Sequence, residues 1–284
     1  MRSFMKTVVI GLGMAMTATT AQAQAWTCGD DTLCKIEATK VLKVGTKDDY
    51  KPWSYRTADG SFVGLEVDLA KALADVLGAK VEIVKVNSAN RFEFLAQGQI
   101  DLMIASATDT ADRRRVVGMV HPNYYSSGYN LLMPKAVTAT TWEQMAGQTI
   151  CATQGAWYNK PAQEKFNIKL LAFAGTAEVE SALLAGRCVG ILADDNLINV
   201  MLADASAKWK DYQMSLPTQE DAPWGIAVRL TDLDKPWGHF VSGMIADWHR
   251  SGRLLELEKA NGIGESAYLR KMHEALKDYI SVQN

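Results

Sequence analysis

The sequence predicts an α/β protein of two lobes joined by a two-strand hinge. Strand and helix patterns alternate in two separate blocks, a further apolar strand follows the second block, and two long helices come last. The 284 residues also exceed one ordinary domain of about 100–150 residues. Two compact lobes, each built on its own sheet, are therefore expected.

The first block alternates strand, helix, strand, helix, strand. Gly64–Gly78 carries apolar residues at helical spacing, and its last glycine ends the predicted helix. The predicted strands are Val41–Gly45, Val81–Val86 and Ile100–Ala105, and the second predicted helix is Arg91–Gln97. This alternation predicts a parallel sheet.

The pattern restarts after Leu131 and Leu132 with a second α/β unit of similar size. Its predicted strands are Thr149–Thr153, Lys169–Phe173 and Val189–Ala193, with helices starting near Tyr158 and over Ala177–Leu184. Strand, helix and strand again alternate, so a second parallel sheet is expected.

The last segments return the chain to the first lobe. Gly225–Val228 predicts a strand, and Lys235–Arg250 and Glu265–Tyr279 predict helices that pack on the first lobe. The chain thus crosses between the lobes near Ser127–Lys135 and near Asp221–Arg229, and such paired segments form a hinge. We place lobe 1 at residues 24–131 and 226–284, and lobe 2 at residues 132–225.

Residues 1–23 have the pattern of a secretory signal peptide. Arg2 and Lys6 precede the apolar run Val8–Met16, and the small residues Ala21 and Ala23 follow. The apolar run is shorter than the ~20 residues of a spanning helix. We expect cleavage and export to the periplasm as a soluble protein.

The four cysteines agree with an oxidising compartment. Three pairings are possible, and we expect the local one, Cys28 with Cys34 and Cys151 with Cys188. Neither spacing is typical of a zinc site, so no metal is expected, and no cofactor motif is present.

The net charge of −2 gives no nucleic-acid footprint, and the run Arg113–Arg115 is too short to make one. Only four histidines exist, and none sits in a recognisable nucleophile motif, so no catalytic residue is assigned. We expect a monomer whose partner is a small molecule.

Ligands of open α/β sheets bind at the carboxyl ends of the strands. Ser106, Thr108 and Arg113 follow the third predicted strand, and hydroxyls, a helix start and a guanidinium fork suit a carboxylate. Asp194 ends the matching strand of lobe 2 and could accept from an ammonium group. Opposite charges from opposite lobes match the two ends of a zwitterionic amino acid.

The loop after the first strand is rich in aromatic residues. Tyr50 is expected in the cleft, where it could stack on a ligand, whereas Trp53 is expected to be an ordinary core or surface aromatic.

Several ordered motifs resemble the amino-acid-binding proteins of bacterial ABC importers. Gly64–Ala70 resembles the family's G-F-D-x-D-L-A signature, and Asn90–Asp101 its N-R-x-x-x-L-x-x-G-x-x-D pattern. The run Ser106–Arg113 is similar to its T-x-T-x-E-R pattern. The resemblance continues through Tyr124–Gly128, Gln154–Gly155, Gly186–Cys188, Asp194 and Trp224–Val228, so it covers nearly the whole chain after the signal peptide.

The resemblance implies a type II periplasmic-binding-protein-like fold and delivery of the ligand to an ABC transporter permease in the inner membrane. It implies that Arg113 binds the ligand α-carboxylate with Ser106 and Thr108, and that Asp194 binds the α-ammonium. A bridge like Cys151–Cys188 also occurs in some relatives.

Departures from the family pattern concern the ligand side chain. Trp157 stands where relatives often have a threonine at the start of a lobe 2 helix. Lys47 stands where binders of neutral and basic amino acids frequently have aspartate, and Ser88 and Arg91 resemble positions lining the side-chain pocket of glutamate/aspartate binders. These residues favour a polar or acidic amino acid.

Two other functions are compatible with this fold. Cyclohexadienyl dehydratases resemble the chain near its first strand, but they place a glutamate where this sequence has Leu197, so we expect no enzyme. A sensor domain of a membrane receptor is the other alternative, and we expect none because no second anchor precedes Asn284.

Overall fold

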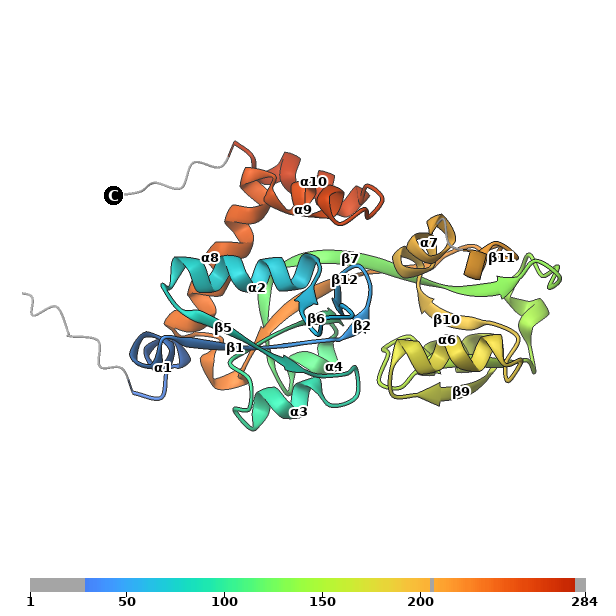
Figure 1. The fold of residues 1–284 in the computed structure, drawn as a ribbon, viewed down its shortest axis with the longest axis horizontal. Coiled ribbons are helices and arrows are strands. Elements are labelled where there is room, and N and C mark those ends of the chain that lie inside the picture. The colour runs from blue at the N-terminus through green and yellow to red at the C-terminus, as the bar shows by residue number, and fades with distance from the viewer. Residues whose placement is uncertain (1–28, 205–206, 279–284) are drawn as a thin grey trace, which may run out of the picture.

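The computed structural model describes residues 29–204 and 207–278. The predicted signal peptide and Cys28 lie outside the described residues. Within the described ranges, no helix is long and apolar enough to cross a membrane. Figure 1 shows two lobes side by side, joined by two long strands.

Lobe 1 is built on three parallel strands. The strand β1 (Val41–Thr46) pairs with β5 (Lys80–Lys85) and with β6 (Leu102–Thr108). The helices α2 (Leu65–Val76) and α3 (Arg91–Ala96) connect them, as the apolar spacing predicts, and α4 (Ala111–Arg114) follows β6. The core of this lobe includes Leu42, Val44, Leu69, Leu73 and Leu102, none of which is exposed.

Lobe 2 contains the second parallel unit. The strand β8 (Thr149–Thr153) lies between β9 (Lys169–Phe173) and β10 (Ile191–Asp194). The helices are α5 (Asn159–Phe166), α6 (Thr176–Leu184) and α7 (Asp195–Ala203), and the shorter elements are η1 (Trp142–Met145), η2 (Ala207–Trp209) and β11 (Tyr212–Gln213). Helix α7 was not predicted.

Two long strands carry the chain between the lobes. The strand β7 (Gly118–Pro134) pairs antiparallel with β12 (Gln219–Val228) and then with β10. The sheet order among the described residues is β5-β1-β6-β12-β7-β10-β8-β9, with β11 on β7. Each lobe is therefore a mixed sheet and not the purely parallel one expected, because β7 and β12 return antiparallel to the strands beside them.

The hinge strands approach each other closely at Gly128. A Cβ at this glycine would lie 2.4 Å from Thr218 and 2.6 Å from the carbonyl of Gln219. Nearby, the hydroxyl of Ser127 donates to Asp195 over 2.7 Å, which ties the start of α7 to the hinge. A side chain at position 128 would force the two crossing strands apart.

A small sheet replaces the loop expected after β1. The strands β2 (Asp49–Tyr50), β3 (Ser54–Arg56) and β4 (Phe62–Val63) form it. Trp53 is fully buried in the core of lobe 1, as expected of an ordinary core aromatic.

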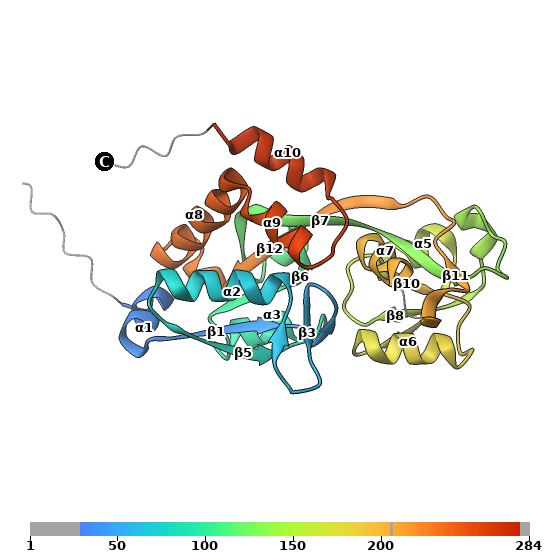
Figure 2. The ribbon, with the colours of Figure 1, turned by 45° about the horizontal axis from the view of Figure 1, so that its top comes forward.

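The terminal segments pack on lobe 1. The helix α1 (Thr32–Thr39), which the sequence patterns did not reveal, packs near α8. The last elements are η3 (Leu230–Asp232), α8 (Pro236–Ser251), α9 (Arg253–Ala260) and α10 (Ala267–Leu276). Figure 2 shows α10 beside α8 above this lobe. Tyr125 of β7 donates to buried Glu258 of α9 over 2.7 Å, which ties this terminal helix to β7.

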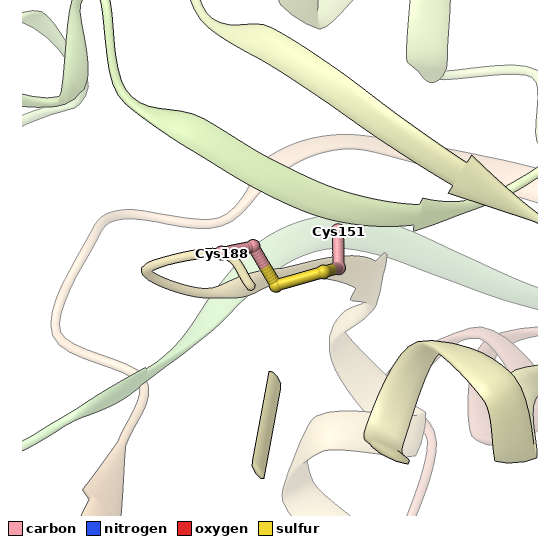
Figure 3. The surroundings of a disulfide bond; sticks show 2 residues. All are labelled: Cys151 and Cys188. Atoms are coloured by element: carbon pink, nitrogen blue, oxygen red, sulfur yellow. A yellow bond between two sulfur atoms is a disulfide. The ribbon is translucent and has the colours of Figure 1, made fainter. Parts of the chain in front are cut away.

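The disulfide between Cys151 and Cys188 is present (Figure 3). It joins β8 to the segment that precedes β10, across 37 residues of sequence. Cys34 is also disulfide-bonded. Its expected partner, Cys28, lies outside the described residues, so that pairing stays a prediction.

Candidate ligand-binding site between the lobes

A small cavity lies where the two lobes meet, at the carboxyl ends of β1, β6, β8 and β10. Its lining residues are Lys47, Tyr50, Ser88, Arg91, Ser106 and Thr108 from lobe 1, and Thr153, Ala156, Trp157, Tyr158 and Asp194 from lobe 2. Its volume is about 20 Å³, which is room for about one water molecule. The lobes must therefore separate before a molecule as large as an amino acid can enter.

Eight of the nine ligand-binding residues predicted from sequence line this one cavity. The ninth, Arg113, is absent from the lining but bridges the lobes beside it. Its guanidinium donates to the carbonyl of Thr108 over 2.8 Å and to that of Gly155, in lobe 2, over 3.1 Å. Burial, together with nearby Arg91, lowers the pKa of Arg113 to about 9, so it remains charged at neutral pH.

The sequence patterns placed Ser106 and Thr108 after the third strand. In the structure both residues lie within β6. The helix that follows, α4, has four residues, and the Thr110 hydroxyl caps it by accepting from the amide of Arg113 over 3.3 Å. The Arg113 side chain therefore supplies the charge at this end of the site, since so short a helix adds little dipole.

Asp194 is the acidic group of the cavity. It precedes α7, but its side chain makes no capping hydrogen bond to that helix. Instead it accepts from the hydroxyl of Tyr50, across the lobes, and from that of Tyr158 over 3.4 Å. Burial raises the pKa of Asp194, and the positive charge of Lys47 opposes that rise.

Lys47 and Arg91 bring positive charge to the lobe 1 wall. The ammonium of Lys47 lies 3.6 Å from the ring centre of Tyr50. Burial, followed by the charge of Arg91, lowers the pKa of Lys47 to about 8. Arg91 is 2% exposed, and one guanidinium nitrogen donates to the carbonyls of Ala105 and Ser106 while its Nε has no partner among the described residues.

Five ionisable groups dominate the charge of the site. Lys47, Arg91 and Arg113 are cations, and Asp194 and buried Glu66, directly behind the cavity, are carboxylates. Their formal charges sum to one positive charge. A zwitterion leaves that excess in place, whereas a ligand with one extra carboxylate neutralises it.

Residues 42–281 match the model of the bacterial extracellular solute-binding proteins, family 3. This protein belongs to that family.

The similarity of this family 3 solute-binding protein to individual relatives is moderate. It is 30% identical over 205 residues to the ABC transporter glutamine-binding protein of Bacillus subtilis, covering 70% of this chain and 73% of the relative. A structure of the solute receptor for L-cysteine of Neisseria gonorrhoeae superposes with a TM-score of 0.73 at 27% identity, over 81% of this chain and 92% of the other. The cyclohexadienyl dehydratase of Pseudomonas aeruginosa is 37% identical over 83 residues, which is 29% of this chain and 31% of the enzyme.

Sequence reasoning about this solute-binding protein missed four residues at the site. Thr153, Ala156 and Tyr158 line the cavity, and Glu66 lies behind it. Thr153 could have been found, because it ends a predicted strand. Glu66 stands inside the first motif quoted above, but nothing in its local sequence shows that the side chain turns inward.

Proposed function

We propose that this protein captures an acidic or strongly polar amino acid and delivers it to an ABC transporter permease. One observation carries the proposal: a cation, Arg113, and a carboxylate, Asp194, stand on opposite lobes beside one cavity whose other charged side chains are positive. The family membership supports a binding role.

The two ends of the ligand have separate anchors in this proposal. Arg113, with the hydroxyl of Thr108, binds the α-carboxylate through the planar fork of the guanidinium. Asp194, with Tyr50 beside it, accepts from the α-ammonium. Direct contacts between the lobes, such as Arg113 to Gly155, would be exchanged for contacts with the ligand.

Lys47, Ser88 and Arg91 face the ligand side chain in this proposal. The positive charges of Lys47 and Arg91 favour a carboxylate or another strong acceptor. Arg91 Nε is also buried without an acceptor in the part of the chain that the structure describes. Trp157 narrows the lobe 2 side of the cavity and favours a short side chain.

The proposal places the protein in the periplasm after removal of residues 1–23. We propose the lobe boundaries that the sequence predicts, with lobe 1 from residues 24–131 and 226–284, lobe 2 from residues 132–225, and the hinge between them. We infer that it acts as a monomer without a metal or cofactor.

The same fold could host a dehydratase, and the 83-residue similarity to cyclohexadienyl dehydratase is the observation that favours this alternative. Such an enzyme needs a general acid at the reacting centre. The dehydratases resemble this chain but have a glutamate at the position of Leu197. Leucine cannot act as a general acid, and Leu197 is absent from the cavity lining. We infer a binding protein and not an enzyme.

A thermal-shift screen followed by calorimetry tests the proposed function. L-Glutamate and L-aspartate should raise the melting temperature more than L-glutamine, L-cysteine or L-arginine, since binding to the native state stabilises it by RT ln(1 + [L]/Kd). A shift with arginine alone would overturn the ligand class. Conversion of prephenate or arogenate would overturn the binding role.

A further inference from the structure

The carboxylate of Glu66 accepts several hydrogen bonds from buried groups behind the cavity. It lies in the first turn of α2 and has no exposed surface. Its Oε1 accepts from the amide of Ser106 over 2.7 Å, from the hydroxyl of Ser106 over 2.7 Å and from the hydroxyl of Tyr124 over 2.6 Å. Oε2 accepts from Thr46 over 3.4 Å. One carboxylate thus links α2 to β1, β6 and β7.

Ser106 has an unusual backbone, with φ at +48°. This left-handed conformation is unfavourable for a residue with a Cβ. It falls where the pairing of β6 with β12 shifts register, so the Ser106 amide turns to Glu66. The carboxylate of Glu66 therefore supplies the acceptor that this irregular strand segment needs.

The hydrogen bond to Glu66 also decides what the Ser106 hydroxyl can do. A serine hydroxyl has one hydrogen and two lone pairs. Because the hydrogen is directed to Glu66, the hydroxyl oxygen of Ser106, a residue of the cavity lining, offers lone pairs only. An oxygen in that state accepts from a ligand N–H and repels a carboxylate oxygen.

We propose that Glu66 is a positioning residue that holds Ser106 as an acceptor for the ligand α-ammonium. This inference rests on the proposed binding of an amino acid. Ser106 then acts with Asp194 at the amino end of the ligand, in place of the carboxylate role that the family resemblance implies. Glu66 itself does not touch the ligand.

The test compares affinity for an amino acid with affinity for the same molecule lacking the amine. Calorimetry with L-glutamate and with glutarate gives the ratio of the glutarate dissociation constant to the L-glutamate dissociation constant. This ratio measures how much the ligand amine contributes to binding. Glu66→Leu removes the acceptor, so the ratio should fall by about tenfold, the scale of one charge-assisted hydrogen bond. Glu66→Gln keeps an acceptor oxygen and should retain most of the ratio.

Ser106→Gly is the matched variant, because glycine adopts the left-handed backbone without a hydroxyl. It should lower the ratio by itself, and in its background Glu66→Gln and Glu66→Leu should change the ratio no further. An unchanged ratio in folded Ser106→Gly, or equal effects of the Glu66 variants with and without the hydroxyl, would overturn the proposal. If Glu66→Leu does not fold, Ser106→Gly still tests whether the Ser106 hydroxyl accepts from the ligand ammonium.

A second pair of probes separates this proposal from the ligand class. The comparison is repeated with L-arginine and 5-guanidinopentanoate, which is arginine without its amine. If the protein binds these two compounds and not L-glutamate and glutarate, the acidic ligand class is refuted. The contribution of the ligand amine can still be measured from the arginine pair. If neither pair binds, amide hydrogen exchange without ligand tests the role of Glu66 directly. A protected Ser106 amide that loses protection in Glu66→Leu supports that role, and an unprotected wild-type amide, or protection that Glu66→Leu leaves unchanged, refutes it.

Discussion

The guanidinium of Arg113 is held in place by one backbone carbonyl from each lobe. It donates to the carbonyl of Thr108 over 2.8 Å and to that of Gly155 over 3.1 Å. Removing one partner of a desolvated charge pair costs ~2–5 kcal/mol, so Arg113→Ala should weaken amino-acid binding by roughly 30-fold to several thousand-fold. Arg113→Lys keeps the charge without the fork and should recover only part. Isothermal calorimetry measures both.

Arg115→Ala is the control for this prediction. Arg115 belongs to the same basic run, but its side chain is 77% exposed and pairs with Asp112 on the surface. Its substitution should leave the affinity within about twofold of wild type, as for exposed ion pairs. Wild-type binding by an Arg113→Ala protein that circular dichroism shows to be folded would place the carboxylate anchor elsewhere.

The lowered pKa of Lys47, about 8, predicts a pH dependence of binding. An unfolded lysine has a pKa of about 10.4. Between these values the unfolded chain binds the extra proton, so this group makes stability rise with pH across that window. The native Lys47 loses its charge as pH rises past about 8, and affinity for L-glutamate should fall there.

Lys47→Met is the comparison for the pH dependence, because the ligand's own amine titrates equally in both proteins. Its affinity should be lower at pH 7 and should decline less between pH 7 and 9. Parallel pH profiles for the two proteins, measured by calorimetry, would remove Lys47 from the ligand's electrostatic environment.

At the scale of elements, the start of α6 meets β2 across the lobes. The carboxylate of Asp49 accepts from the amide of Ala177 over 3.2 Å, and a Cβ at Gly175 would lie 2.5 Å from that carboxylate. Asp49 is absent from the cavity lining. It therefore acts as a helix cap that forms when the lobes are closed.

Asp49→Ala should weaken binding of every ligand by a similar factor, about fivefold, since a lost cap costs ~1 kcal/mol and destabilises the closed form alone. Asp48→Ala is the matched control, because Asp48 pairs with Lys85 within lobe 1 over 2.8 Å. Calorimetry with two ligands should show the same loss for both in Asp49→Ala. A change in their ranking would mean that Asp49 contacts the ligand.

At the scale of the whole molecule, the cavity of about 20 Å³ is too small for an amino acid unless the lobes move. The motion is expected at β7 and β12, the two strands that connect the lobes (Figure 1). These crossing segments approach each other closely at Gly128. Small-angle scattering should show a smaller radius of gyration at saturating ligand than without ligand. Arg113→Ala at the same ligand concentration should show little compaction, and an unchanged wild-type profile at proven saturation would argue against hinge closure.

Local sequence patterns were enough to predict the alternation of strands and helices and the residues at the strand ends. The apolar periods of α2 and α6 are local, and parallel strands bring their carboxyl ends to one edge, so the sequence patterns alone could place Lys47, Thr108 and Asp194 together. Family motifs added Ser88 and Arg91 to that set.

The pairing of the buried polar groups, in contrast, depends on the three-dimensional fold. Glu66 reaches Ser106 across 40 residues of sequence, and Tyr50 reaches Asp194 across 144. Helix α7 and the small sheet β2-β3-β4 also escaped the sequence patterns. These features depend on which side chains the packing of distant segments brings together. A buried carboxylate is stable only where hydrogen-bond donors surround it, and here the donors come from distant parts of the sequence. No local sequence pattern predicts such pairings.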